Sequence, residues 1–462
     1  MARYFFDHAL LPDGWTRDVV IEVDPDGNFA SVRSVSGVER TDAIAAGEYF
    51  SVCVPGIVNA HSHAFQRAMA GLAEYRGNTR DTFWTWREVM YKFAMAMTPE
   101  DQRDISAYLH IELLKHGYTS LVEFHYLHNR PDGSAYDDPA IMSLATLDAA
   151  KESGIGLTHI PVLYMTSGFD GRPLEARQKR FGQTAESLLR IWQTVDEAVS
   201  GNPDFATGLS AHSLRAVPPS DLELLLASRT DRVRFPFHIH IAEQEGEVDA
   251  CLGHYGTTPV AWLLDRAQVD ESWTLVHATH ITIDEYVALA GTGATIAFCP
   301  STEGNLGDGI CPAQDYCEHG GSFAIGSDSH VCVSPWEELR WLEYVQRLNH
   351  RERNVMAIGN KSTGGALLQG LSSSAASVTG RSVGHIVNGA RADLVVLDVA
   401  SPQLAGRSPE SIIDTIIFAS NDNPVKHVMV GGVWRIHDGR HEAETEVAAR
   451  YQKVQERLMA GL

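Results

Sequence analysis

The sequence predicts an α/β fold: a (β/α)8 TIM-like barrel together with a small β-sandwich domain that is built from both chain ends. Two observations lead to this prediction. From residue 54 onward, eight short apolar runs alternate with helical stretches, which is the count of a closed parallel barrel. Before and after that region, short strand-like runs are separated by turns rich in Gly, Pro and Asp.

The composition is that of a globular protein and excludes several classes of function. The chain has 462 residues, 44% of them hydrophobic and 21% charged, with a formal net charge of -22. Proteins bind nucleic acids through positively charged surfaces, so no nucleic-acid partner is expected for this acidic chain. We also expect no signal peptide and no membrane association, because no apolar run is long enough for either. The six cysteines contain no Cys-x-x-Cys, which predicts reduced thiols in a cytoplasmic protein.

The β-rich segments at the two ends are expected to form one composite domain. Residues 1–53 contain the strand-like runs FFDHALL, DVVIEV, FASVRSV and YFSVCV, which are too few to bury a core alone. Residues 386–441 contain two more such regions, NGARADLVVLDV and KHVMVGGVWRIHDGRH. The simplest arrangement pairs both groups in one β-sandwich. The polar residues 442–462 are expected to form a helical tail.

Residues 54–385 are assigned to the barrel. Its clearest helix follows Thr98, which is placed to cap it, with Pro99 in the first turn, Asp101 at the capping-box position and Gly117 at the end. An open doubly wound sheet is the alternative, but no G-x-G-x-x-G follows an early strand. The expected barrel strands are GIVNAHSH, TSLVEFHY, LTHIPVLY, ATGLSAHSL, RFPFHIHIAE, WTLVHATH, ATIAFCPST and SFAIGSDSH.

The stretch VPGIVNAHSHAFQR, residues 54–67, carries a His-x-His pair at the end of an apolar strand. Side chains two residues apart on a strand share a face, so His61 and His63 point toward one place. This geometry suits half of a metal site, although short matches are common in a chain with 21 histidines. The pair becomes informative only if other strands deliver ligands to the same place.

Other strand ends supply such ligands, and barrel enzymes place their chemistry at the carboxyl ends of their strands. We expect His61, His63, His240 and Asp328 to bind one divalent metal ion, with zinc favoured by three neutral imidazoles and a carboxylate. Any one of them alone would more often be a satisfied histidine or a helix-capping aspartate. The chemistry-bearing residues at the strand ends are His61, His63, Tyr126, His212, His240, Glu243, His277 and Asp328.

The expected metal site indicates a hydrolytic enzyme, because a bound metal ion lowers the pKa of water from 15.7 to about 7 and so supplies hydroxide at neutral pH. Glu243 could carry a proton from the attacking water to a leaving nitrogen, and His277 could hold the hydroxide or polarise the developing charge. Asp328 is counted among the catalytic residues as well as the ligands. His280 is a better candidate than His277 for a purely structural histidine.

One ion per subunit is expected. No Lys lies near the end of the third, fourth or fifth strand, where a modified lysine would support two ions. The zinc signature of cytidine deaminases is also missing, because Cys299 and Pro300 offer a single thiol there.

These motifs resemble the amidohydrolase superfamily, in particular its mononuclear-zinc deaminase branch, and within it the formimidoylglutamate deiminases of histidine degradation. The resemblance is carried by HSHAFQRAMAG, FWTWREVMY, EFHYLHN, AHSLRAV, CPSTEGNLGDG and SDSHVCVSPWEELR. It implies hydrolysis of N-formimidoyl-L-glutamate to N-formyl-L-glutamate and ammonia, with Glu243 as proton shuttle. It also implies that Arg87 and Arg215 bind the carboxylates of a dicarboxylate substrate. Gln66, Tyr126 and His212 would complete the pocket. A homodimer is expected as the commonest symmetric assembly.

Three alternatives stay open. A related deaminase acting on a purine or another aromatic ring such as guanine would need stacking groups and no pair of arginines. Trp84 and Trp86 are compatible with it, although we interpret them as loop anchors. A non-catalytic scaffold on the same barrel would have lost ligands or the shuttle acid, whereas the set here is complete. Finally, Arg87 could form a surface ion pair with Glu88, an explanation that is harder to apply to Arg215.

Overall fold

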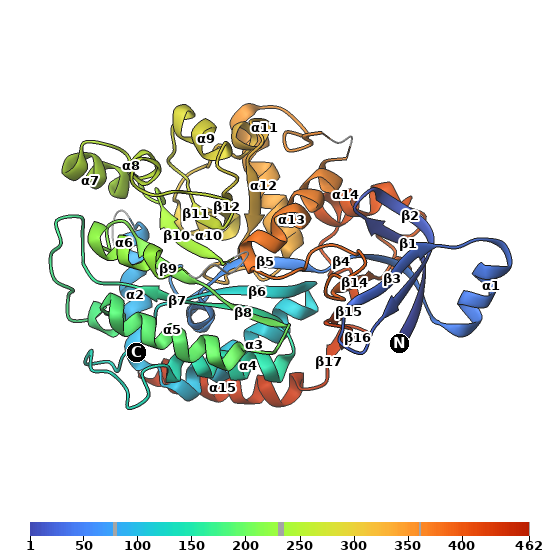
Figure 1. The fold of residues 1–462 in the computed structure, drawn as a ribbon, viewed down its shortest axis with the longest axis horizontal. Helices are drawn as coiled ribbons and strands as arrows, with labels where there is room; N and C mark the ends of the chain where they lie inside the picture. The colour runs from blue at the N-terminus through green and yellow to red at the C-terminus, as the bar shows by residue number, and fades with distance from the viewer. Residues whose placement is uncertain (77–80, 230–234, 360–361, 462) are drawn as a thin grey trace.

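The computed structural model describes residues 1–462 apart from 77–80, 230–234, 360–361 and 462. It consists of a large α/β lobe beside a smaller β-rich lobe (Figure 1). The large lobe holds a parallel sheet curled into a barrel, and the small lobe holds a sheet to which both ends of the chain contribute. The fold class predicted from the sequence is confirmed.

The barrel strands follow one another in chain order. They pair in parallel in the order β5-β6-β7-β9-β10-β11-β12-β13, and the short β8 (Phe205–Thr207) pairs with β7. The ring closes where Ser62 and Asp328 form a parallel bridge. Each predicted run overlaps one of these strands, although Arg234, the first residue of the fifth run, lies outside the described residues. The strands are β5 (Ile57–Ser62), β6 (Tyr118–His125), β7 (Gly156–Leu163), β9 (Leu209–Ser213), β10 (Phe237–Ile241), β11 (Trp273–His277), β12 (Thr295–Phe298) and β13 (Ser322–Ile325).

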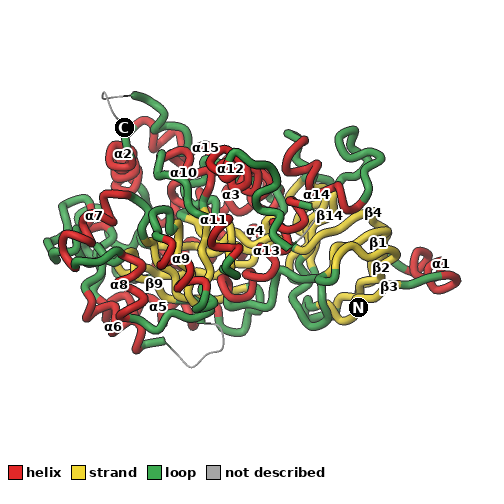
Figure 2. Tube along the Cα trace, turned by 90° about the horizontal axis from the view of Figure 1, so that it is seen from above, coloured by secondary structure: helices red, strands yellow, loops and turns green. Residues whose placement is uncertain are grey.

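Helices surround the barrel, so its strands are covered on the outside as well as packed within (Figure 2). Every residue of β5, β6 and β7 is buried, as expected for parallel strands between two layers. The helical elements of this lobe are η1 (Ala64–Met69), α2 (Phe83–Ala96), α3 (Pro99–Lys115), α4 (Ile141–Ser153), η2 (Gln178–Arg180), α5 (Ala185–Val199), α6 (Pro219–Ala227), α7 (Glu245–Tyr255), α8 (Pro259–Arg266), α9 (Ile283–Ala290), α10 (Pro300–Leu306), α11 (Ala313–Glu318), α12 (Pro335–His350) and α13 (Thr363–Thr379).

Helix α3 shows how the local sequence sets an element. Asp101 N–H donates to the Thr98 hydroxyl at 3.2 Å, and Thr98 N–H donates to Asp101 Oδ2 at 2.7 Å, which is the predicted capping box. Pro99 occupies the first turn, where its missing N–H costs nothing. Ile105 and Leu109 are fully buried, and α3 packs against β6.

The small lobe is one sheet that curls around its own core. Its strand order is β17-β16-β15-β14-β4-β1-β2-β3, so the N-terminal and C-terminal halves meet where β4 pairs with β14. The rings of Tyr4 on β1 and Trp434 on β16 meet edge to face at 5.5 Å across the curl. Helix α1 (Gly37–Ala46) interrupts the predicted series of strands and turns, and it packs Ala43 against Phe5. The other elements are β1 (Ala2–Leu11), β2 (Gly14–Val23), β3 (Phe29–Ser34), β4 (Glu48–Pro55), β14 (Leu394–Leu397), α14 (Pro409–Ala419), β15 (Val425–Val430), β16 (Val433–His437) and β17 (Arg440–His441).

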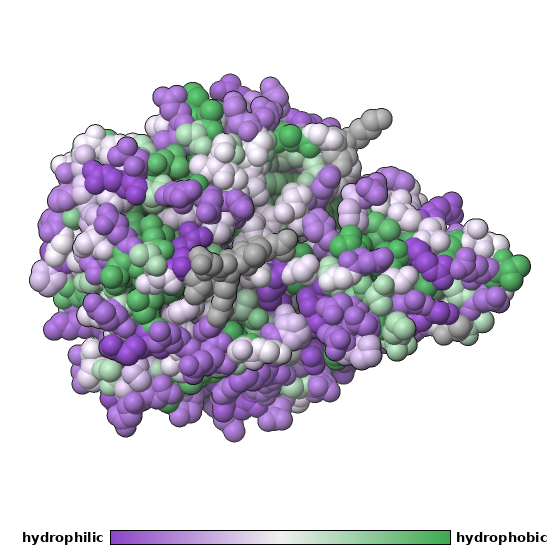
Figure 3. All heavy atoms as spheres, viewed as in Figure 1, coloured by the Kyte–Doolittle hydropathy of each residue, from purple (hydrophilic) through white to green (hydrophobic). Residues whose placement is uncertain are grey.

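Helix α15 (Glu444–Ala460) returns the C-terminus to the large lobe, where it lies along α3 (Figure 1). Tyr451 stacks on Tyr108 with ring centroids 4.1 Å apart, and Arg450 bonds to Asp104 at 3.1 Å. On the face drawn in Figure 3, hydrophilic residues predominate and hydrophobic ones form small separate patches. Among the described residues, no helix has both the length and the apolar character needed to cross a bilayer.

Candidate metal and substrate site

The carboxyl end of β5 pairs with the end of the last barrel strand, and this pairing positions the His-x-His motif. His63 N–H donates to the Asp328 carbonyl at 3.0 Å, and Asp328 N–H donates to the His61 carbonyl at 3.0 Å. Gly326 permits the close approach, because a Cβ there would lie 2.6 Å from His61 Cβ. Closure of the barrel therefore brings residues 61, 63 and 328 together.

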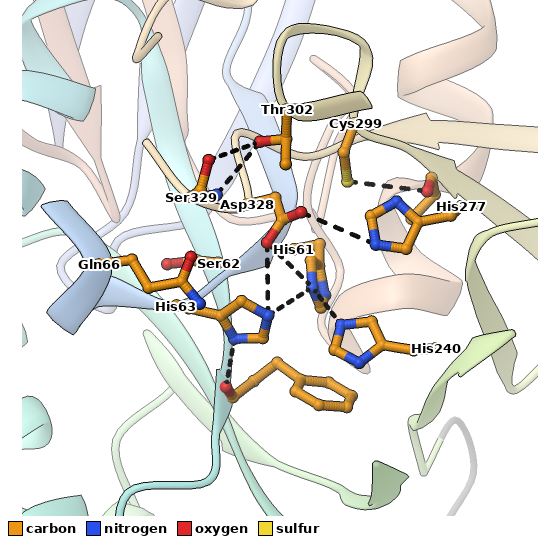
Figure 4. A network of polar contacts seen from close by, with 12 residues as sticks. His61, Ser62, His63, Gln66, His240, His277, Cys299, Thr302, Asp328 and Ser329 are labelled. Atoms are coloured by element: carbon orange, nitrogen blue, oxygen red, sulfur yellow. Dashed lines mark hydrogen bonds and ion pairs between the residues drawn. The ribbon is translucent and has the colours of Figure 1, made fainter. Parts of the chain in front are cut away.

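Three imidazoles meet at this point. His61 Nε2 lies 3.2 Å from His63 Nε2 and 2.9 Å from Nε2 of His240, which comes from β10 (Figure 4). Asp328 Oδ1 lies 3.3 Å from His63 Nε2 and 3.7 Å from His61 Nε2. All four side chains are buried. The residues expected to be ligands thus present their donor atoms to one small volume.

The donor set fits a divalent cation. His63 Nδ1 hydrogen-bonds to the Phe124 carbonyl at 2.9 Å, which leaves the Nε2 lone pair free to coordinate. Burial lowers the pKa of His63 to about 3 and the pKa values of His61 and His240 well below the ordinary value, so the three rings are neutral. Burial also raises the pKa of Asp328 to about 7, and a cation at this point would compensate its charge.

Asp328 faces a second group with its other oxygen. Oδ2 lies 3.7 Å from His277 Nε2, and the same nitrogen lies 3.7 Å from Glu243 Oε1. Glu243 follows β10 and His277 ends β11, so neighbouring strand ends deliver the two side chains. Burial alone lowers the pKa of His277, but Glu243, Cys299 and Glu303 together raise it well above the ordinary value. These acid and base groups thus lie next to one another beside the imidazole cluster.

The backbone is strained where these side chains leave the strands. His277, Asp328 and Ala242, which precedes Glu243, have φ angles of 70°, 45° and 51°, in the left-handed region that few non-glycine residues adopt. Such conformations cost about 1–3 kcal/mol each and persist only where the surrounding structure imposes them. His277 and Asp328 are among the residues that the sequence analysis expects to be catalytic, and Ala242 precedes a third, Glu243.

A cavity lies beside the cluster, and the metal-site and substrate-site residues expected from the sequence both line it. The first group is represented by His63, His240, Glu243, His277 and Asp328. The second is complete, with Gln66, Arg87, Tyr126, His212 and Arg215. Aromatic side chains form much of the remaining wall, namely Phe83, Trp86, Tyr91, Tyr164 and Phe181.

The two arginines face this cavity and form no ion pair with a carboxylate of the described residues. Arg87 donates from Nε to the Tyr91 hydroxyl at 2.7 Å and lies over the Tyr91 ring. Glu88 pairs with Arg177 at 2.6 Å, so the surface ion pair considered for Arg87 is not formed. Together with Arg215, this gives one cavity two guanidinium groups, which suits a ligand with more than one carboxylate.

Two buried acids around the site were not identified from the sequence. Glu303 Oε1 lies 3.3 Å from His277 Nδ1 and accepts from the Cys299 N–H at 2.9 Å. Glu123 accepts from the Ala64 N–H at 2.8 Å, next to His63. The available signal was a charged residue inside or directly after a strand-like run that is otherwise apolar, as in TSLVEFHY.

The structure also locates two tryptophans and a histidine for which the sequence suggested structural roles. Trp84 and Trp86 lie on helix α2, so placing them on a loop was wrong; Trp84 is 48% exposed and only Trp86 lines the cavity. The helix begins after Thr82, whose carbonyl accepts from the Trp86 N–H at 3.2 Å. His280 hydrogen-bonds to the Asp308 carbonyl at 2.8 Å, a structural contact of the kind expected for it.

Comparison with known sequences gives matches over nearly the whole chain. The model of the amidohydrolase family matches residues 52–435. A formimidoylglutamate deiminase of Pseudomonas aeruginosa is 44% identical over 455 residues, which cover 98% of this chain and 99% of the relative. An 8-oxoguanine deaminase of the same species is 26% identical and covers 89% of this chain and 88% of the relative.

Solved structures of other proteins superimpose on nearly the whole chain. An amidohydrolase of Brucella melitensis superimposes with a TM-score of 0.92 and 39% identity, covering 99% of this chain and 100% of the other. An adenosine deaminase of Xanthomonas campestris with bound zinc superimposes with a TM-score of 0.81 over 99% of this chain and 98% of the other. At 18% identity, the second likeness concerns the fold alone.

Proposed function

The chain belongs to the amidohydrolase family, and from that premise we propose that it hydrolyses N-formimidoyl-L-glutamate to N-formyl-L-glutamate and ammonia. It is a homologue of formimidoylglutamate deiminase and hence a hydrolytic enzyme. The observation that carries the proposal is the single cavity shared by the histidine–carboxylate cluster and two arginines. That combination suits a substrate with a hydrolysable C–N bond at one end and carboxylates at the other. The release of ammonia, not formamide, rests on the likeness to the curated relative.

In the proposed mechanism His61, His63, His240 and Asp328 hold one divalent ion, for which we propose zinc. The bound ion supplies a Lewis acid that brings the pKa of water close to neutrality. Three imidazole nitrogens and a carboxylate are the donor set that supports this choice of metal. The protein's other contribution is to exclude bulk water, since all four side chains are buried.

Glu243 moves the protons. Its carboxylate takes a proton from the attacking water and passes it to the imino nitrogen, as the C–O bond forms and the C=N π bond breaks. The proton of the new hydroxyl reaches the same nitrogen through Glu243 as the C–N bond breaks and ammonia leaves. His277 Nε2, 3.7 Å from Glu243 Oε1, donates a hydrogen bond to the oxygen on which charge develops.

Arg87 and Arg215 bind the substrate carboxylates, and each charge-assisted hydrogen bond contributes about 1.5–3 kcal/mol. Gln66 and Tyr126 act together, because Gln66 Nε2 donates to the Tyr126 hydroxyl at 2.9 Å, and His212 completes the pocket. The aromatic walls would also accept a purine-like ring, which is the second candidate substrate. A neutral ring would leave two half-buried guanidinium groups without a carboxylate partner, so the arginines favour the dicarboxylate.

We further propose that the enzyme serves histidine degradation in the cytoplasm and assembles as a homodimer. The name of the P. aeruginosa relative supports the pathway. All cysteines of the described residues are free thiols, which supports a reducing compartment. The homodimer rests on the general prevalence of twofold symmetry.

Ammonia release from N-formimidoyl-L-glutamate tests the proposal. We expect turnover by the wild type and none with guanine or 8-oxoguanine. Glu243→Gln should lose roughly a hundred- to ten-thousandfold in kcat, because an amide cannot shuttle the proton, while its metal content stays unchanged. Glu245→Gln changes an exposed acid two residues away and is the matched control.

Two outcomes would count against the proposal. Full activity in Glu243→Gln would remove this residue from the mechanism. Ammonia release from a purine, with none from N-formimidoyl-L-glutamate, would replace the substrate assignment by the second candidate.

A further inference from the structure

Cys299 is a buried potential ligand that the proposed mechanism does not use. It follows β12 and has no exposed surface, and its sulfur contacts the Ala297 carbonyl at 3.9 Å and hydrogen-bonds with the side chain of His277. The sulfur, one ring nitrogen of His277 and one carboxylate oxygen of Asp328 all lie within 4.8 Å of one another. Thiolate, imidazole and carboxylate are the ligand types that bind zinc and related soft cations.

The carboxylate of Asp328 is shared between two groups of ligands. Its Oδ1 faces His61 and His63 at 3.7 and 3.3 Å, whereas its Oδ2 faces His277 Nε2 at 3.7 Å. In Figure 4, Asp328 lies between the imidazole cluster on one side and His277 with Cys299 on the other. A carboxylate with one oxygen on each side can bridge two cations that are about 3.5–4 Å apart.

The surroundings of this second group favour positive charge. Glu303 lies 3.3 Å from His277 Nδ1, and Glu243 lies 3.7 Å from His277 Nε2. Two carboxylates, one beside each nitrogen of this imidazole, create a negative potential that the low dielectric of the interior strengthens.

We propose that His277, Cys299 and Asp328 form a second, weaker metal site that takes a thiophilic divalent cation, Zn²⁺ or Cd²⁺, when that cation is in excess. The cation enters through the cavity, which His277 and Asp328 line. Binding forms a sulfur–metal and a nitrogen–metal bond and releases to solvent the thiol proton of Cys299 and the proton on the coordinating nitrogen of His277, with no change of oxidation state.

Occupation of this site inhibits the enzyme, because the ion takes the His277 nitrogen that donates a hydrogen bond to the oxygen on which charge develops. The inhibition rests on the proposed function, whereas the binding does not. The site is the weaker of the two because it offers three ligand atoms, one of them from the Asp328 carboxylate that it shares with the first site, whereas the first site offers three imidazoles and a carboxylate.

Titration of the metal-loaded protein with Cd²⁺ in the absence of substrate tests the binding. A cadmium–thiolate bond gives an ultraviolet charge-transfer band, which imidazole and carboxylate ligands alone do not give. We expect a band in the wild type that is lost in Cys299→Ser and kept in Cys251→Ser, a control with an equally buried thiol on α7. The difference between the variants isolates Cys299 from the partly exposed thiols Cys317 and Cys332. A band unchanged in Cys299→Ser would overturn the proposal.

Ammonia release measured over the same titration tests the inhibition. In the wild type, half-inhibition and half-formation of the band should occur at the same Cd²⁺ concentration. In Cys299→Ser, compared with its own uninhibited rate, half-inhibition should need at least about tenfold more Cd²⁺, because altering the ligand environment typically costs 10–100-fold in metal affinity.

If Cys299→Ser does not fold, measurements on the wild type alone still test the second metal site. Complete inhibition with only one bound ion per chain would overturn the second site. A Cys299-dependent band in a protein that releases no ammonia from N-formimidoyl-L-glutamate would support the site and contradict the proposed function.

Discussion

His63 and His159 show how little a buried histidine says about its role when it is considered alone. Burial lowers the pKa of each ring to about 3, so both are neutral. His63 donates from Nδ1 to a backbone carbonyl and points Nε2 at two other imidazoles. Neither ring nitrogen of His159 has a hydrogen-bond partner among the described residues. The difference is position, because His63 directly follows β5 whereas His159 lies in the middle of β7.

Arg215→Met tests the proposed binding of substrate carboxylates. Loss of a charge-assisted hydrogen bond of about 1.5–3 kcal/mol should raise KM roughly ten- to a hundredfold, with a smaller change in kcat. Steady-state ammonia release measures both quantities. Arg172→Met is the matched control, because Arg172 is 65% exposed and pairs with Asp170. An unchanged KM in Arg215→Met would contradict the role.

His159→Asn tests a pH-dependent contribution to stability. Burial, followed by the nearby His128 and His110, lowers the pKa of His159 to about 3, against about 6.5 in an unfolded chain. As the pH falls through 6.5, the unfolded state binds a proton that the folded state does not, so this histidine lowers the free energy of unfolding between pH 6.5 and about 3.

The variant lacks this contribution, so its free energy of unfolding should improve relative to the wild type as the pH falls from 7 to 5. Urea denaturation at several pH values measures the difference. His437→Asn, at an exposed position, controls for the substitution itself. A difference between wild type and His159→Asn that does not vary with pH would rule out the effect.

Among the elements, the helices differ most in how far their sequences predict them. Helix α3 carries its own start signal in Thr98, Pro99 and Asp101, and the structure confirms it. Helix α2 begins with aromatic residues that are weak helix formers, and its buried Met90, Tyr91 and Phe93 pack in the core around the site. Tertiary packing thus supplements a weak local start signal in α2, where the Thr82 N–H donates to the Thr85 hydroxyl at 3.0 Å.

Gly326→Ala tests whether the close approach of β5 and β13 positions the proposed metal ligands. The added Cβ would lie 2.6 Å from His61 Cβ and 2.9 Å from the His61 carbonyl oxygen. Separation of the strands should destabilise the protein by about 1–3 kcal/mol and lower its metal content. Chemical denaturation and metal analysis measure the two effects.

The control for that substitution is Gly246→Ala, on helix α7, where a Cβ would meet nothing within 4 Å. This change should leave the metal content unchanged and slightly raise stability, because alanine is the better helix former. Equal behaviour of the two variants would show that the approach at Gly326 is not what positions His61.

For the whole molecule, the proposed metal site ties together segments that lie far apart in the chain, namely β5, β10 and the end of β13. Chelation should therefore abolish ammonia release and lower Tm, and Zn²⁺ should restore both. An ion present at 100 times its Kd stabilises the native state by about 2.7 kcal/mol. The Tm of a His61→Asn variant should respond much less to the chelator. A wild-type Tm that does not change after verified metal removal would contradict a site that links these strands.

The division of the molecule into lobes also depends on distant pairing. Strand β4 pairs with β14 through Cys53 and Val396 and their neighbours, more than 300 residues apart in the chain. The turn-rich ends of the sequence suggested such a domain, and the sheet of the small lobe confirms that both ends build it. The division at residues 1–53 plus 386–441, 54–385 and 442–462 stays a prediction.

The sequence by itself determined the alternation of strands and helices, the barrel, and the set of strand-end residues that share one cavity. Strand periodicity and barrel topology are sufficient for that, because parallel strands of a closed barrel end on the same rim wherever they lie in the chain. Only the tertiary structure decided that Glu303 reaches His277, that Asp328 presents one oxygen to each of two ligand groups, and that Cys299 lies beside them. These contacts depend on the loops and strained backbone that turn each side chain inward, and no local sequence pattern encodes that geometry.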